Sequence, residues 1–165
     1  MRRVLLIALI VLGLDQATKA LVVDRLPLGA SWAPLPDLAY IFQFTHTTNT
    51  GMAFGLFQGG STILTIAALA TVTLLLGYAR RVGTAQPVLL VALGLILGGA
   101  LGNLTDRLTR GSVVDFIDVG PFWIFNLADS GVVVGGILLA LSMWFQDDPA
   151  PAPAPPAEPS GIEHG

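Results

Sequence analysis

The order of hydrophobic and polar positions divides the chain into four long apolar runs separated by more polar segments. The second, third and fourth runs carry no charged residue. A helix needs roughly 20 residues to cross a bilayer, and no soluble core requires several uncharged runs of this length. The pattern therefore predicts an all-α polytopic membrane protein with four transmembrane helices, at residues 4–23, 61–79, 87–105 and 130–146.

The first run also has features of a secretory signal peptide, because Arg2 and Arg3 precede its apolar stretch. A cleavage site would require small residues one and three positions before the cut, and Lys19 occupies one of those places. Asp15 lies four residues before Lys19, so the two side chains can pair on one helix face. We expect the first run to be retained as a span, with Asp15 and Lys19 as a structural ion pair.

Positive charge at the ends of the runs predicts the orientation in the membrane. Arginine pairs stand at residues 2–3 and 80–81, tight against span ends, and such pairs favour the cytoplasmic side. Three arginines in the opposite segments make the bias modest. Both ends of a four-span domain would then be cytoplasmic, and residues 24–60 and 106–129 would lie outside. Residues 40–45 are β-rich and partly alternating, which predicts a short strand or two there.

Composition excludes several classes of function. Only 12% of the 165 residues are charged and 53% are hydrophobic, whereas soluble domains carry about 25% charged residues. The net charge of -3 argues against a nucleic-acid partner. The absence of cysteine and the presence of only two histidines leave no thiol nucleophile and no thiolate or histidine metal cluster. We expect one membrane domain over residues 1–146 and a disordered Pro/Ala-rich tail over residues 147–165.

Glycines recur every four residues in the third run, at Gly94, Gly98 and Gly102, and the fourth run repeats the spacing at Gly131 and Gly135. Small residues at this spacing let helix backbones approach closely. The spacing predicts that the third and fourth spans touch.

Two aspartates near the external ends of the third and fourth spans are candidates for chemistry. Asp115 is flanked by residues that favour burial, and Asp129 opens the fourth span. Gly120 and Pro121 between them let the chain double back. Two carboxyls in near contact share one proton, and such a pair can activate water and protonate a leaving group, as in aspartic proteases.

Structural alternatives exist for these acids. Asn126 and Asp129 have the spacing of a helix N-terminus, with Asn126 as the N-cap. Asp115 can equally be a loop acid bonded to nearby amides. Asp118 is the natural rival for the chemistry, and Asp106 beside Arg107 is typical of a paired surface acid.

Asn103 and Arg107 stand four residues apart, on the helix face that also carries Gly99. An amide and a guanidinium at the interface can bind a peptide carbonyl, a lipid ester or a phosphate. Arg107 can equally extend to lipid headgroups for purely structural reasons.

Two other functions fit the same pattern. A proton- or ion-handling protein would use the acids as relay groups, but the second and third runs have no acid in their interiors. A non-catalytic membrane scaffold would use the acids only as helix caps, and substitution of Asp115 or Asp129 would then spare function.

Five ordered segments together resemble the lipoprotein signal peptidases, also called signal peptidase II. No single segment is decisive, but the set is specific and extends over roughly the first 145 residues. The segments are Asp-Gln-Ala-Thr-Lys at 15–19, Asn-Thr-Gly-Met-Ala-Phe-Gly at 49–55, Gly-Gly-Ala-Leu-Gly-Asn-Leu-Thr-Asp-Arg-Leu at 98–108, Val-Val-Asp-Phe-Ile-Asp at 113–118 and Phe-Asn-Leu-Ala-Asp-Ser at 125–130.

The resemblance implies an aspartic endopeptidase of the bacterial inner membrane, active at the periplasmic face. Such enzymes remove signal peptides from prolipoproteins by cleaving before a cysteine that carries diacylglycerol. Members have four spans, a small periplasmic sheet and a periplasmic loop or helix over the site, and residues 52–57 form an apolar strip suited to that cover. The family needs no metal or other cofactor and is inhibited by the cyclic peptide globomycin. We expect membrane lipids around the protein, and a monomer.

The resemblance also assigns roles to residues of this chain. It places the catalytic pair at Asp115 and Asp129. Polar contacts to substrate or inhibitor fall on Asn49, Gly51, Asn103, Arg107 and Asn126. Asp15, Lys19 and Asp106 are expected to support the site.

Overall fold

The computed structural model describes residues 1–51, 60–82 and 86–145. These residues form four long helices, one short 3-10 helix and four strands. The helices are α1 (Arg2–Arg25), α2 (Gly60–Ala79), α3 (Pro87–Arg110) and α4 (Leu127–Trp144), and the 3-10 helix is η1 (Pro36–Leu38). The strands are β1 (Ser31–Trp32), β2 (Gln43–Asn49), β3 (Val113–Asp118) and β4 (Ile124–Phe125).

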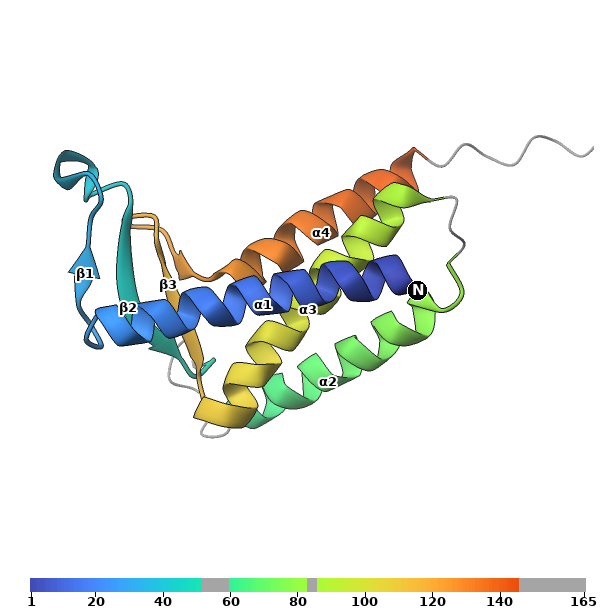
Figure 1. Cartoon of the computed structure of the whole chain (residues 1–165), viewed down its shortest axis with the longest axis horizontal. Helices are drawn as coiled ribbons and strands as arrows, with labels where there is room; N and C mark the ends of the chain where they lie inside the picture. The colour runs from blue at the N-terminus through green and yellow to red at the C-terminus, as the bar shows by residue number, and fades with distance from the viewer. Residues whose placement is uncertain (52–59, 83–85, 146–165) are drawn as a thin grey trace, which may run out of the picture.

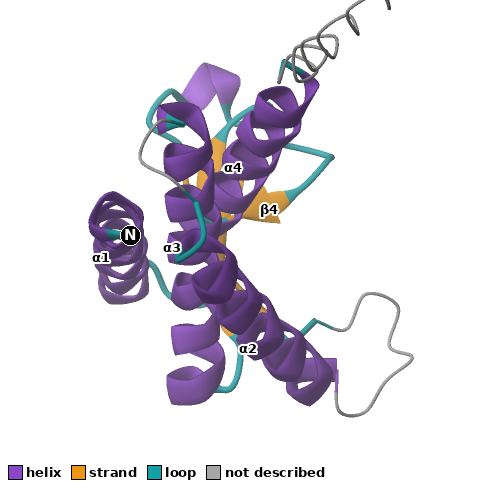
Figure 2. Cartoon of the chain, turned by 90° about the vertical axis from the view of Figure 1, so that its right-hand side faces the viewer, coloured by secondary structure: helices purple, strands orange, loops and turns teal. Residues whose placement is uncertain are grey.

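All four predicted spans are helices that are long and apolar enough to cross a membrane. The helix α3 lies in the middle and packs against the other three, as Figure 2 shows. The four-stranded sheet lies at one end of the helices, and the N-terminus lies at the other (Figure 1). The prediction of a four-helix membrane protein with a small sheet is therefore confirmed.

Residues that favour helix ends mark both ends of α3. Pro87 occupies the first turn of α3, where its missing N–H is not needed. Gly111 follows α3 with a φ of 78°, the left-handed conformation that commonly terminates helices. Because α3 runs to Arg110, it is longer than the predicted span at 87–105, and its last turns carry residues expected in an external loop.

Close contacts at glycines pack the helices together, and the glycines of α3 contact α1 as well as α4. A β-carbon on Gly94 would lie 2.7 Å from Ile7 of α1, and one on Gly98 would lie 2.7 Å from the Ala8 carbonyl oxygen. The contact between α3 and α4 uses Gly99 on one side and Gly135 on the other. The predicted contact of the third and fourth spans is confirmed, while Gly94 and Gly98 serve the contact with α1.

The sheet is antiparallel throughout, in the order β1-β2-β3-β4. The predicted strand at residues 40–45 is only partly correct, because β2 begins at Gln43 and continues to Asn49. Backbone bonds from Ile41 and Phe42 to the Leu38 carbonyl oxygen hold the preceding residues in a turn. Pro36 opens η1 and favours that turn over an extended strand.

Candidate active site

Asp115 lies in the middle of β3, only 3% exposed. Its Oδ1 accepts a hydrogen bond of 2.7 Å from Asn126 Nδ2, and its Oδ2 accepts one of 3.1 Å from Asn49 Nδ2. Burial raises the pKa of Asp115 above its ordinary value of 3.8, and the negative charge of Asp129 acts in the same direction. The two hydrogen bonds and the charge of Lys19 oppose that shift without cancelling it. Asp115 is therefore a carboxyl that holds its proton more tightly than an exposed aspartate does.

Asp129 lies in the first turn of α4 and is half-buried. Its backbone N–H donates to Asn126 Oδ1 over 2.9 Å, so the predicted N-cap at Asn126 is confirmed. The Asp129 carboxylate accepts a hydrogen bond of 2.7 Å from Asn103 Nδ2 of α3. The positive end of the α4 dipole favours negative charge at this position. The capping role thus belongs to the Asn126 side chain, and the Asp129 carboxylate faces a different partner.

Two asparagines connect the two acids. Asn126 is fully buried, and its Nδ2 lies 2.7 Å from Asp115 and 3.2 Å from Asn103 Oδ1. Asn103 in turn donates to Asp129. The structure therefore joins Asp115 and Asp129, from β3 and α4, in one hydrogen-bonded cluster whose connecting groups are neutral amides.

A bulge in β2 lets Asn49 reach Asp115. The register is Phe44 opposite Ile117 but Thr47 opposite Asp115, so β2 contains one extra residue between Phe44 and Thr47. Because side chains alternate along a strand, this extra residue reverses the face taken by the residues that follow. Asn49 consequently lies on the face of Asp115, while Thr45 lies on the opposite face.

Asp118, the rival acid, lies on that opposite face, three residues after Asp115 in the same strand. Its carboxylate accepts hydrogen bonds from Gln43 (2.8 Å), Thr45 (2.7 Å) and the Gly120 N–H (3.1 Å). These contacts tie β2 to β3 and to the turn after β3. The structure therefore gives Asp118 structural partners, on the face of β3 opposite to that of Asp115.

Gly51 and Arg107 border the cluster. The Gly51 N–H donates to Asn49 Oδ1 over 2.8 Å, in a backbone conformation with a φ of 78° that favours glycine. Gly51 therefore orients the Asn49 amide. Arg107 is half-buried, and its Nη1 lies 3.4 Å from the Asn103 carbonyl oxygen one turn earlier. The apolar strip at residues 52–57 lies outside the described residues.

The predicted ion pair of Asp15 and Lys19 is present, with Lys19 Nζ 2.9 Å from the Asp15 carboxylate. Lys19 also contacts Asp106 Oδ2 over 2.8 Å, and all three side chains are 0% exposed. The interpretation of Asp106 as a surface acid paired with Arg107 is wrong. The last turns of α3 continue past residue 105 and turn Asp106 inward against α1, where Lys19 neutralises it.

Sequence reasoning missed the role of Gln16. Its Nε2 lies 3.2 Å from the carboxylates of Asp15 and Asp106 and from the Gly102 carbonyl oxygen. A polar residue beside an aspartate within an apolar run was the available signal.

An apolar groove of about 240 Å³ between α1 and α4 does not belong to this site. Its lining includes Leu127 and Gly131 of α4. Asp129 is two residues from each, or about 200° around the helix, so the groove faces the other way. Within residues 1–51, 60–82 and 86–145, no three His, Asp or Glu side chains form a group that could hold a metal ion.

Several known proteins are similar to this chain in sequence. A family model described as signal peptidase (SPase) II matches residues 7–145. The lipoprotein signal peptidase of Halothermothrix orenii is 39% identical over 144 residues, which cover 87% of this chain and 97% of that protein. The lipoprotein signal peptidase of Bacillus subtilis is 41% identical over 142 residues, which cover 84% of this chain and 90% of that protein.

Solved structures show the same fold. A bacterial membrane enzyme determined by the in meso method at 1.9 Å resolution superposes with a TM-score of 0.80. It is 32% identical in sequence, and the match covers 89% of this chain and 96% of that one. A second bacterial membrane enzyme, at 2.3 Å resolution, gives a TM-score of 0.77 at 32% identity and covers 87% and 88% of the two chains.

Proposed function

We propose that this chain, which belongs to the signal peptidase II family and removes signal peptides from prolipoproteins, cleaves with Asp115 and Asp129 as a paired acid and base. The observation that carries the proposal is the asparagine bridge between the two carboxyls. Asn126 donates to Asp115 and Asn103 donates to Asp129, each over 2.7 Å. Neutral amides orient both acids without compensating their charge, and this leaves a proton free to move between the acids and a substrate.

The environments of the two acids suggest which one holds the shared proton. Burial raises the pKa of Asp115, so Asp115 is the proton donor. Asp129 lies at the positive end of α4 and is the better site for negative charge, so it acts as the base.

In the proposed reaction, a water molecule between the carboxyls attacks the carbonyl carbon of the peptide bond before the lipidated cysteine. Asp129 takes a proton from this water as the new C–O bond forms. Asp115 gives its proton to the carbonyl oxygen, which forms a tetrahedral intermediate with two hydroxyl groups. When the C–N bond breaks, Asp129 gives its proton to the departing amine and Asp115 takes a proton back from one of the two hydroxyl groups. The pair thus returns to one proton shared by two carboxyls.

Polar residues around the pair are suited to holding the substrate. Asn49 and Asn126 orient Asp115, and Gly51 fixes the Asn49 amide. We assign Asn103 and Asn126 to substrate contact as well as to the bridge. Arg107 carries a charge suited to a peptide carbonyl or a lipid ester or phosphate at the membrane surface.

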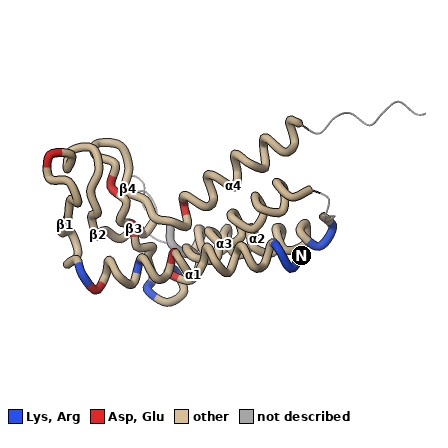
Figure 3. The backbone as a smooth tube through the Cα atoms, turned by 45° about the horizontal axis from the view of Figure 1, so that its top comes forward, with Lys and Arg blue, Asp and Glu red and all other residues tan. Residues whose placement is uncertain are grey.

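The orientation in the membrane follows from charge. Figure 3 shows basic residues at the end of the bundle where α1 begins and α2 ends, and the middle of the bundle is free of charge. Arginine pairs favour the cytoplasmic side, so we place both ends of the four-span domain there and the sheet with the acids at the outer, periplasmic face of the inner membrane. A lipid-modified substrate cannot leave the bilayer, and this depth lets its peptide bond reach the acids.

Further parts of the proposal concern the whole chain. We assign residues 1–146 to the peptidase domain and residues 147–165 to a tail that the reaction does not need. The enzyme acts as a monomer on a prolipoprotein in the membrane, and globomycin-type cyclic peptides compete for the same site.

The test is a gel-shift cleavage assay with purified protein and a diacylglyceryl-modified prolipoprotein. Wild type is compared with Asp115→Asn and Asp129→Asn, and Asp118→Asn serves as the matched control because it lies on the other face of the same strand. We expect cleavage by wild type and by Asp118→Asn, and none by the other two variants when folded. Near-full activity in folded Asp115→Asn or Asp129→Asn would refute the pair.

A further inference from the structure

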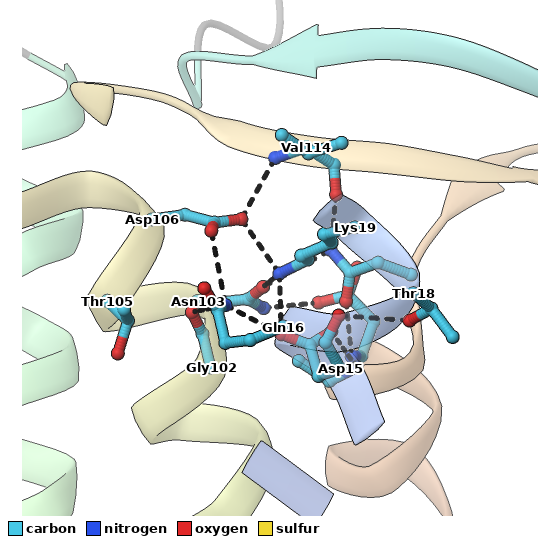
Figure 4. Close-up of polar contacts among 12 residues, drawn as sticks. Asp15, Gln16, Thr18, Lys19, Gly102, Asn103, Thr105, Asp106 and Val114 are labelled. Carbon is cyan, nitrogen blue, oxygen red and sulfur yellow. Dashed lines mark hydrogen bonds and ion pairs between the residues drawn. The ribbon is translucent and has the colours of Figure 1, made fainter. Parts of the chain in front are cut away.

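The ammonium group of Lys19 lies in a buried cluster of polar side chains that supplies all of its hydrogen-bond acceptors. Lys19 is 0% exposed, and its Nζ lies 2.9 Å from Asp15 Oδ2, 2.8 Å from Asp106 Oδ2 and 3.0 Å from Asn103 Oδ1. Figure 4 shows these side chains converging from α1 and α3. An ammonium has three N–H donors, and each of the three has one acceptor.

Each carboxylate of this cluster also holds a backbone amide beside a proposed catalytic acid. Asp15 Oδ1 accepts from the Ala128 N–H over 2.9 Å, one residue before Asp129. Asp106 Oδ2 accepts from the Val114 N–H over 3.1 Å, one residue before Asp115. The same ammonium therefore contacts both carboxylates that hold β3 and α4 at the site.

The third contact of Lys19 determines how the Asn103 amide points. Asn103 Oδ1 faces the ammonium, so the Nδ2 group faces Asp129 and donates to it. A reversed amide would place N–H groups against the ammonium and the oxygen against the Asp129 carboxylate. Both contacts would then be repulsive, so charge on Lys19 selects the orientation that serves Asp129.

We propose that Lys19 is a positioning residue for the reaction, acting through Asn103 on Asp129 and through Asp15 and Asp106 on the two elements that carry the acids. This inference rests on the proposed function and deepens it. It extends the role of Lys19 beyond an ion pair within α1.

The proposal has consequences that loss of stability alone would not produce. Loss of Lys19 frees the Asn103 amide and misorients Asp129, which lowers kcat more than it changes KM. The charged groups that act on Asp115 are Asp129 on α4 and Lys19 on α1, and Asn49 and Asn126 are its hydrogen-bond donors. Because the Lys19 charge lowers the pKa of Asp115, its removal raises that pKa further and moves the alkaline limb of the pH–rate profile to higher pH.

Lys19→Met alone would remove the ammonium from two buried carboxylates and leave Asp106 with the longer ion pair to Arg110, at 3.7 Å. The principal variant is therefore the double substitution Asp15→Asn with Lys19→Met, which keeps the net charge of the cluster unchanged. Asn at position 15 retains an oxygen that can accept from the Ala128 N–H. Gln16→Met is the matched control, because Gln16 contacts the same two carboxylates but not Asn103.

The experiment measures kcat, KM and the pH–rate profile for cleavage of a diacylglyceryl-modified prolipoprotein, with thermal unfolding in detergent as the check on folding. For the double variant we expect a loss of about 10²-fold in kcat, as for a misplaced catalytic group. Because Asn103 is also assigned to substrate contact, we expect KM to rise, but by a smaller factor than kcat falls. Lys19 acts on the pKa of Asp115 whereas Asp15 is not among the groups that do, so the alkaline limb should also move to higher pH. Gln16→Met should lose thermal stability and keep the alkaline limb of wild type.

A folded double variant with the kcat and pH profile of wild type would overturn the inference while the proposed function stood. The same displacement of the alkaline limb in Gln16→Met would also overturn it, because general loosening would then explain the effect. Wild type that failed to cleave would overturn the proposed function and this inference together.

Discussion

Two groups of aspartates lie close together at the same end of the bundle, and their partners differ. Asp15 and Asp106 are fully buried and each contacts the Lys19 ammonium within 2.9 Å. Asp115 and Asp129 are instead contacted by the neutral amides of Asn126 and Asn103. The first group has a cation between its acids, and the second has none.

This difference distinguishes aspartates that stabilise the fold from aspartates that are suited to catalysis. A carboxylate held against a buried ammonium is an ion-pair partner of that group, since either partner alone would be an uncompensated buried charge. A carboxyl held by amides is oriented but not neutralised, so it can gain or lose a proton during a reaction. The partners of a polar group at membrane depth therefore indicate its role better than its presence alone does.

The largest effect should come from removing an acid of the amide-bound group. Asp129→Asn keeps the shape and the α4 cap made by Asn126, but it removes the base. We expect kcat to fall by about 10³-fold or more, as for other groups that act as a unit, with thermal stability nearly unchanged. Cleavage kinetics and thermal unfolding in detergent measure the two effects. A variant that was inactive because it had unfolded would contradict the prediction.

For the ammonium-bound group we expect a clear loss of stability. Asp106→Ala leaves Lys19 paired with Asp15 alone, and it removes the acceptor of the Val114 N–H and of the Gln16 amide. Leaving a buried donor without its acceptor costs about 1 to 3 kcal/mol of stability. Thermal unfolding measures it, and a variant as stable as wild type would show that the pair contributes nothing to the fold.

Much of this comparison could be predicted from the sequence because its signals are local. The spans follow from uncharged runs, the Asn126 cap from a spacing of three residues, and the Asp15–Lys19 pair from a spacing of four. Asp115 and Asp129 were singled out by their apolar neighbours and by their place at span ends.

The remaining features depend on contacts between distant parts of the chain. Asp106 is buried because α3 continues beyond the apolar run and packs against α1, and no local pattern indicates that Lys19 reaches it. The bulge in β2 that turns Asn49 toward Asp115 depends on register with β3. Partners of the α3 glycines likewise follow from three-dimensional packing, as Gly98 against α1 shows.

A smaller effect should follow from adding a side chain at Gly102, which lies between the ammonium-bound and the amide-bound aspartates. A β-carbon on Gly102 would lie 2.5 Å from Asp15 Oδ2 and 3.1 Å from the Ala128 β-carbon. Gly102→Ala should therefore cost about 1 to 3 kcal/mol by overpacking. Gly136→Ala is the matched control, because its β-carbon would meet nothing within 4 Å, and equal unfolding temperatures for the two variants would refute the packing argument.

The smallest effect is a displacement of pH dependence. The Asn49 hydrogen bond lowers the pKa of Asp115, so Asn49→Ala should raise that pKa. Asp115 gives up its proton in the proposed reaction, and activity is lost as pH rises through its pKa. The alkaline limb of the pH–rate profile should thus move to higher pH in Asn49→Ala, whereas a limb that moved to lower pH would assign the proton to a different group.

The most direct measurement is infrared difference spectroscopy of the protonated carboxyl C=O band, recorded as pH is raised above the ordinary aspartate value of 3.8. Wild type is compared with Asp115→Asn and Asp106→Asn. The account predicts that the band above that pH is weaker in Asp115→Asn than in wild type and in Asp106→Asn, because Asp115→Asn lacks the carboxyl with the raised pKa. A band of wild-type strength in Asp115→Asn and a weakened band in Asp106→Asn would place the mobile proton in the ammonium-bound group and contradict the central claim.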